Sequence, residues 1–221
     1  DARDALAAFI AAHGPRLVIK PVDGTEGRGV GCFDLRQPAR RAAALRHLAH
    51  LGDAALLTEE RGTVHARTDT GPARCVLRVN VCWDGARAWP ESGYAQLAGP
   101  HGIASAGRGG RVIALGDLWR RLCRADGRPF TPAHDDWTRL LMAAARGADA
   151  LAQELGAAMP ALIGLDLLLD AADDGRLLPL LLEANPRPSG MARCALITPD
   201  GPTDAPGIAP HLWPRIARLH A

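Results

Sequence analysis

The scarcest charged residue in this sequence is lysine. Lys20 is the only lysine among 26 lysine and arginine residues in a chain of 221 residues. The abundance of alanine and arginine suggests a coding bias that has converted interchangeable lysines into arginines. A lysine retained against that bias is expected where a compact ammonium group is needed, because arginine presents a flat fork instead. Chance survival is the alternative explanation.

Other absences exclude several classes of protein. The net charge is only +2 and aromatic residues make up 4% of the chain, so we expect no nucleic-acid partner. The five cysteines have no CxxC spacing and are odd in number, which favours a reducing cytoplasm over a disulfide framework or a zinc site. No apolar run is long enough to span a bilayer, and no basic-then-apolar signal opens the sequence, so we expect a cytoplasmic protein without a membrane partner.

The most informative stretch is LEANPRPSG, residues 182–190, which ends a predicted strand. An earlier predicted strand, residues 163–170, precedes it across an Ala-Asp-Asp-Gly turn, so the pair predicts a β-hairpin. Alternation in the first strand places Leu165, Leu167 and Leu169 on one face and Asp166 and Asp170 on the other.

Alternation also divides the returning strand into two faces: Leu178, Leu180 and Leu182 against Leu181, Glu183 and Asn185. Asp166, Glu183 and Asn185 would then lie near one spot. Two carboxylates and an amide oxygen suit a hard cation, most often Mg²⁺. A solvated acidic hairpin is the alternative.

A glycine-rich segment, DGTEGRGVG at residues 23–31, follows a short predicted strand that ends at Lys20. It is not a Walker A loop, because no GK[ST] closes it, and a second strand rather than a helix follows. Glycines there let backbone N–H groups approach a polyphosphate closely, with the charge of Lys20 beside them. An ordinary hairpin is the alternative.

The remaining pattern alternates strands and helices. Helices are expected over residues 5–12 and 38–51, from residue 117 to 124, and from about residue 131 or 135 to 156. Further strands are expected at residues 55–58, 74–82, 87–89, 93–97 and 112–115, and a second glycine-rich loop at residues 107–110. Residues 191–197 and 212–219 predict short helices, and residues 198–210 predict a loop. The only expected boundary lies near residue 60, between a small α+β part, residues 1–60, and a larger one, residues 61–221.

Three pieces in this order resemble the ATP-grasp superfamily: VIKP with GTEGRGVG, a strand ending in TEE, and GLDLLLD followed by LLEANPRPSG. The NPRP form is similar to carbamoyl-phosphate-synthase-like members and to carboxylate–amine ligases. The resemblance covers nearly the whole chain. It implies an α+β fold in which two subdomains with mainly antiparallel sheets grip ATP between them.

The resemblance also implies roles for individual residues. Lys20 would contact the ATP phosphates, with Gly27, Arg28, Gly29 and Val30 in a lid loop over them. Glu59 and Glu60 would lie at the hinge, near the adenine and the ribose. One or two Mg²⁺ ions, or Mn²⁺, would be bound by Asp166, Glu183 and Asn185. The arginines expected to face phosphate or acylphosphate are Arg78, Arg108 and Arg187, and a solvated surface position is the alternative for Arg78 and Arg108.

The implied reaction is an ATP-dependent ligation of a small-molecule or peptide carboxylate to an amine, through an acylphosphate. Fixed cations stabilise the negative charge that both steps build on oxygen. No protein nucleophile is needed, and the sequence has no GxSxG motif or evident Cys/His pairing. A phosphotransferase or carboxylase-type member and a non-catalytic ATP-binding module are the alternatives. The family's N-terminal domain is missing here and is expected on a longer form of this chain or on a partner chain.

Overall fold

The computed structural model describes residues 2–24, 26–52, 55–100, 102–186, 188 and 193–207. Every strand pair in these ranges is antiparallel, so the predicted α+β class with mainly antiparallel sheets is confirmed. None of the helices in these ranges has both the length and the hydropathy that crossing a bilayer requires.

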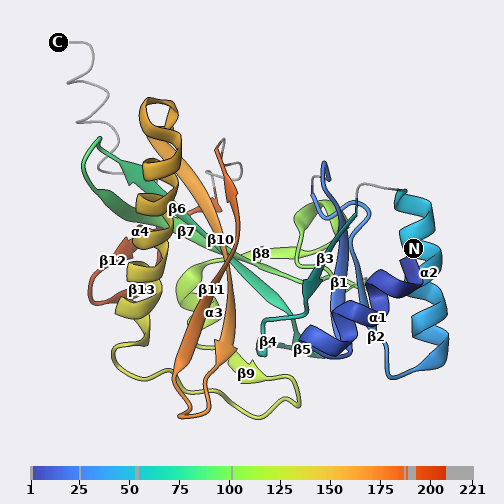
Figure 1. The fold of residues 1–221 in the computed structure, drawn as a ribbon. Coiled ribbons are helices and arrows are strands. Elements are labelled where there is room, and N and C mark those ends of the chain that lie inside the picture. Colours follow the sequence, from blue (N-terminus) through green and yellow to red (C-terminus); the bar gives the residue numbers. More distant parts are fainter. Residues whose placement is uncertain are drawn as a thin grey trace.

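The first part of the chain forms a three-stranded sheet with two helices on it (Figure 1). Its elements are α1 (Ala2–His13), β1 (Arg16–Pro21), β2 (Gly31–Asp34), α2 (Pro38–Leu51) and β3 (Ala55–Glu59). The strand order is β2-β1-β3. Leu17 and Ile19 of β1 are fully buried against Ala44 and Leu48 of α2, because alternate β1 side chains face the helices.

The rest of the chain forms a seven-stranded sheet in the order β11-β10-β6-β7-β12-β13, with β8 paired to β7. Its strands are β6 (Cys75–Trp83), β7 (Ala88–Leu97), β8 (Arg111–Ile113), β10 (Leu162–Ala171), β11 (Leu177–Asn185), β12 (Ala195–Thr198) and β13 (Gly201–Pro206). Helix α4 (Asp136–Leu155) packs on this sheet through Leu140, Ala144 and Ala148, which are fully buried at helical spacing.

Short elements complete the molecule. They are β4 (Val64–Thr68), β5 (Gly71–Ala73), η1 (Ala106–Arg108), α3 (Leu115–Trp119), β9 (Leu122–Arg124) and η2 (Gly156–Ala158). The three strands among them form a third sheet in the order β5-β4-β9. The two hydrophobic cores share no residue: one takes residues from Leu6 to Leu57, and the other begins at Val64. The boundary expected near residue 60 falls in the gap between them, and Figure 1 shows the two parts side by side.

Several element predictions were wrong. The helix expected over residues 117–124 ends at Trp119, and Leu122 and Cys123 are buried in β9 instead, because β4 offers their backbone groups a ladder. The two strands expected at residues 87–89 and 93–97 are one strand, β7, which begins at Ala88 and has a bulge between its pairs with Asn80 and Val81. The described part of residues 191–197, which were expected to form a helix, contains the start of strand β12. The described part of residues 198–210, which were expected to form a loop, contains strand β13. The helix predicted over residues 212–219 lies outside the described residues.

Candidate functional site

A cavity of about 670 Å³ lies between the small sheet and the face of the large sheet. This volume is within the range of about 300–1,000 Å³ typical of small-molecule sites. Most of the residues predicted from the sequence line it: Lys20, Gly27, Val30, Glu59, Arg78, Asp166, Glu183 and Asn185. They come from β1, the β1–β2 loop, β3, β6, β10 and β11. Residues far apart in the sequence therefore share one cavity.

The predicted metal ligands stand side by side on the β10–β11 hairpin. Asp166 pairs directly with Glu183, and Asn185 is opposite Gly164, two residues along. The Asn185 Nδ2 lies 3.4 Å from Asp166 Oδ2 and 3.4 Å from Glu183 Oε1. The amide would have to turn its oxygen toward a cation to act as a ligand, since Nδ2 now faces the carboxylates.

A β-bulge corrects the faces predicted for β11. The register shifts between Asp166 and Leu167, so Leu181 pairs with Leu167 while Glu183 pairs with Asp166. Leu182 is the extra residue and lines the cavity. Leu181 therefore lies with Leu167 on the face of the sheet that α4 covers. It had been expected on the other face, together with Glu183. Bulges commonly re-aim a side chain beside a functional site.

The bulge changes the other leucines too. Leu178 pairs with Asp170, and Leu180 pairs with Leu168, so both occupy the face of the candidate metal ligands rather than the opposite one. Leu178 is 42% exposed, because β11 is an edge strand. Leu165, Leu167 and Leu169 are fully buried, as alternation predicted.

Arg78 lies on β6 beside Asp166, as its cross-strand neighbour on the other side of β10. Its Nε donates to Asp166 Oδ1, and its Nη2 donates to Asp166 Oδ2 at 2.9 Å. The guanidinium also lies 5.9 Å from the centre of the Tyr94 ring. Both charged partners are almost fully buried: Arg78 is 6% exposed and Asp166 is 4% exposed. A row of Glu183, Asp166, Arg78 and Tyr94 thus crosses four strands along the cavity.

This row has a defined electrostatic character. Burial raises the pKa of Asp166, with Glu183 adding to the rise and Arg78 opposing it. A divalent cation between Asp166 and Glu183 would favour the ionised carboxylates, so the donor set fits a hard cation. Within the described ranges no group of three or more His, Cys, Asp or Glu side chains could hold a metal ion. A third protein ligand at this position would therefore have to come from another residue type, such as the amide of Asn185.

Gly164 makes room for Arg78. A Cβ at this position would lie 2.8 Å from Arg78 Cδ and 2.9 Å from Pro188 Cβ, both too close for a methyl group. The glycine of the GLDLLLD segment is therefore a packing requirement of the buried ion pair.

The opposite side of the cavity is the β1–β2 loop. Lys20 and Gly27 line the cavity, and the Lys20 ammonium makes no ion pair within the described part of the chain. Gly27 and Gly29 have φ values of 70° and 69°, which residues other than glycine rarely adopt. His47 of α2 hydrogen-bonds to the Gly29 carbonyl at 2.8 Å and ties the loop to the small sheet's helix.

Two predicted loop residues stand outside this lining. Arg28 is 76% exposed in its side chain and pairs with Glu26 at 3.2 Å, and Gly29 packs near Pro21 and Leu51. The loop reaches across the cavity at Glu26, whose carbonyl accepts a hydrogen bond from Ser105 Oγ at 2.9 Å.

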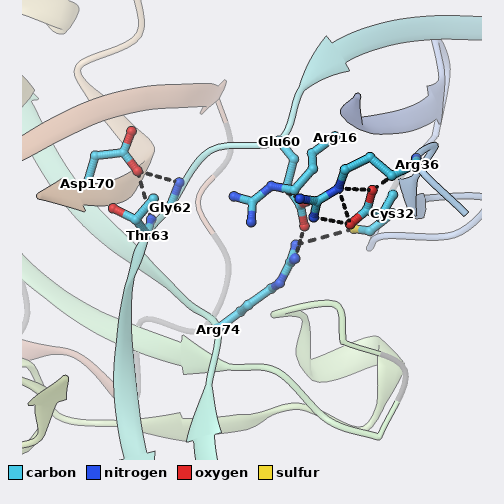
Figure 2. A network of polar contacts seen from close by, with 9 residues as sticks. Arg16, Cys32, Arg36, Glu60, Gly62, Thr63, Arg74 and Asp170 are labelled. Atoms are coloured by element: carbon cyan, nitrogen blue, oxygen red, sulfur yellow. Dashed lines mark hydrogen bonds and ion pairs between the residues drawn. The ribbon is translucent and has the colours of Figure 1, made fainter. Parts of the chain in front are cut away.

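The two predicted hinge acids differ. Glu59 lines the cavity and pairs with Arg61 at 3.1 Å. Glu60 does not line the cavity, and its side chain is only 8% exposed. It forms ion pairs with Arg74 and, at 3.4 Å, with Arg16, as Figure 2 shows.

The other predicted arginines are placed less directly. Arg108 lies on η1 near Gly27 and does not line the cavity. Its Nε is buried and has no hydrogen-bond partner among the residues that the structure describes. Arg187 lies outside the described residues. Sequence reasoning missed Arg74, Tyr94 and Arg193, all of which line the cavity. Only Tyr94 had a signal, as the single tyrosine of a chain poor in aromatic residues.

No known family model matches the chain, and no curated protein sequence matches it. Function must therefore be argued from the cavity itself.

Proposed function

We propose that this chain has the ATP-grasp fold and is an ATP-dependent ligase, or the catalytic portion of one, that joins a carboxylate to an amine. The carrying observation is the composition of one cavity. A lone lysine and a glycine loop face two carboxylates and an amide across it. This pairing suits a polyphosphate whose oxygens are shared between an ammonium group, backbone N–H groups and a metal ion.

In the proposed mode, the nucleotide lies between the two sheets. Lys20 and the β1–β2 loop would hold the phosphates from one side, and the linker at Glu59 would lie toward the nucleoside. Asp166, Glu183 and Asn185 would hold one or two Mg²⁺ ions. When bound, Mg²⁺ would neutralise charge on the phosphate oxygens during transfer.

The chain's own residues would then position and stabilise the acyl group. Arg78 would hold the Asp166 carboxylate in place, and Arg193 would add a second cation to the lining of the cavity. The substrate carboxylate would attack the γ-phosphoryl group of ATP and release ADP. The amine would then attack the carbonyl carbon of the acylphosphate, which would release phosphate and a proton and leave an amide. Catalysis would come from positioning and electrostatics.

The deciding experiment combines calorimetry and product analysis. Titration with ATP and Mg²⁺ tests binding, and release of ADP and phosphate is followed with panels of acids and amines. The ligase proposal requires phosphate release only when both an acid and an amine are present. Transfer to a single acceptor would favour a phosphotransferase or carboxylase-type activity, and ATP binding without turnover a non-catalytic module.

A further inference from the structure

The linker between the two hydrophobic cores is held by one buried carboxylate. Asp170 Oδ1 accepts hydrogen bonds from the backbone N–H groups of Gly62 and Thr63, each at 2.7 Å. Its Oδ2 accepts from Arg61 Nε at 2.7 Å. A fourth hydrogen bond joins β10 to the linker beside this carboxylate: Ala171 N donates to Thr63 Oγ1 at 3.0 Å. Figure 2 shows Asp170 facing Gly62 and Thr63.

Packing reinforces these hydrogen bonds. Gly62 has a φ of 91°, and a Cβ built there would lie 3.2 Å from Leu168 Cδ2. The linker backbone therefore lies directly against β10. Burial alone would raise the pKa of Asp170, but the N–H groups of Thr63 and Gly62 and the Arg61 guanidinium together lower it. The carboxylate is thus kept ionised by the contacts that fix the linker.

The residue before this segment belongs to the other sheet. Glu60 N donates to Arg16 O at 3.1 Å, which extends the β1–β3 ladder by one residue. Gly62 and Thr63 are bound to the large sheet through their backbone N–H groups, Arg61 is bound to it through its side chain, and Glu60 is bound to the small sheet. Within residues 60–63 the backbone is therefore least constrained at the Glu60–Arg61 junction. Two ion pairs bridge that junction: Glu60 with Arg74, and Glu59 with Arg61.

The anchored linker borders the cavity. Glu59, Arg61 and Gly62 all line it, as do Asp166 and Leu168 of the anchoring strand. Asp166 and Asp170 are four residues apart on the same face of β10, so one strand carries both a candidate metal ligand and the linker anchor.

We propose that Asp170 is a positioning residue for the cavity, which clamps residues 61–63 to β10 and confines the hinge between the two sheets to the Glu60–Arg61 junction. Small hinges of this kind absorb domain closure in a few backbone torsions. The clamp does not depend on the ligand, but its effect on nucleotide affinity rests on the proposed function.

The clamp is tested by hydrogen–deuterium exchange of the Gly62 and Thr63 amides. In the unmodified protein both should exchange at least about tenfold more slowly than unstructured amides, as expected for buried hydrogen bonds. Asp170→Ala should raise both rates on the order of tenfold, whereas Asp170→Asn should preserve most of the protection, because an amide oxygen still accepts both N–H groups. Asp174→Ala, which removes a carboxylate paired with Arg176 in the next turn, is the matched control and should change neither rate.

Exchange at the unstructured rate in the unmodified protein would overturn the clamp, even if Asp170→Ala failed to fold. Unchanged rates in a folded Asp170→Ala protein would overturn it as well. Neither measurement requires a nucleotide, so failure here is distinct from failure of the proposed function.

The positioning role is tested with two probes, a non-hydrolysable ATP analogue with Mg²⁺ and inorganic tripolyphosphate with Mg²⁺. Asp170→Ala should weaken the analogue on the order of tenfold and leave tripolyphosphate unchanged, because the linker lies toward the nucleoside end. Asp170→Asn should restore much of the affinity. Equal binding of the analogue by Asp170→Ala and the unmodified protein would contradict a positioning role. An unmodified protein that bound neither probe would contradict the proposed function while leaving the exchange result in force.

Discussion

On the β10–β11 side of the cavity, the candidate ligands stand on paired strands, and on the β1–β2 side Lys20 of β1 is followed by a loop with positive φ at Glu26, Gly27 and Gly29. On the strand side Asp166 is buried and held by Arg78, and Glu183 is its exposed cross-strand neighbour. The loop side is exposed and depends on glycine. This contrast teaches that the two halves of one site can be fixed by different physics: register on one side, backbone freedom on the other.

The largest effect is expected on the strand side. Glu183→Gln should lower ADP release by about a thousandfold, or ~4 kcal/mol of transition-state stabilisation, because an amide cannot replace a carboxylate beside a metal ion. Glu183 is exposed, so the melting temperature of the variant protein should equal that of the unmodified protein. The measurement is steady-state ADP release with saturating Mg²⁺. Turnover equal to that of the unmodified protein would make the metal assignment wrong.

The second prediction concerns stability on the same side. Asp166→Asn should lower the free energy of unfolding by about 3 kcal/mol, because it leaves Arg78 charged and buried without its partner. Urea denaturation measures this loss. The double variant Asp166→Asn with Arg78→Met should recover much of it, since the pair is removed together. A double variant no more stable than the single one would show that the ion pair is not the cause.

A smaller effect is expected on the loop side. Lys20→Arg should weaken binding of ATP with Mg²⁺ by about tenfold, since the flat guanidinium fits a tight phosphate loop less well than an ammonium. Arg40→Lys is the matched control, because Arg40 is exposed on α2 and does not line the cavity. Calorimetry should show no change for the control. Unchanged affinity in Lys20→Arg would leave the lone lysine without a role in binding.

The smallest effect concerns pH. Hydrogen bonding from Arg36 lowers the pKa of Asp34, at the end of β2, from 3.8 to about 2. A lowered pKa contributes stability above the unfolded value, and that contribution is lost as the pH falls toward 2. Asp34→Asn should therefore flatten the acid dependence of the unfolding free energy between about pH 4 and 2. An identical slope in both proteins would contradict this account.

Much of the fold follows from patterns that local chemistry determines. Helix α2 begins and ends where Pro38 and Gly52 predict, and the β10–β11 hairpin follows from alternation around an Asp-Asp-Gly turn. Strand β9 could not be predicted in the same way, because Leu122 and Cys123 become a strand only when β4 is beside them.

The candidate site divides in a similar manner. Asp166, Glu183 and Asn185 could be brought together from strand period alone, although the bulge at Leu182 escaped that reasoning. Nothing in the sequence indicated that Arg74 would form an ion pair with Glu60, since the two residues meet only when the sheets pack together. Local spacing predicts side chains on neighbouring strands, whereas partners from different sheets depend on tertiary packing.

The position of Lys20 has a practical consequence. The only lysine side chain of this sequence faces the cavity. An amine-directed reagent carried on a nucleotide would find no other lysine to label, so the mass of a single modified peptide would report directly on occupancy. Because no other lysine occurs in the sequence, Lys20 gives the cavity a single site for amine-directed labelling.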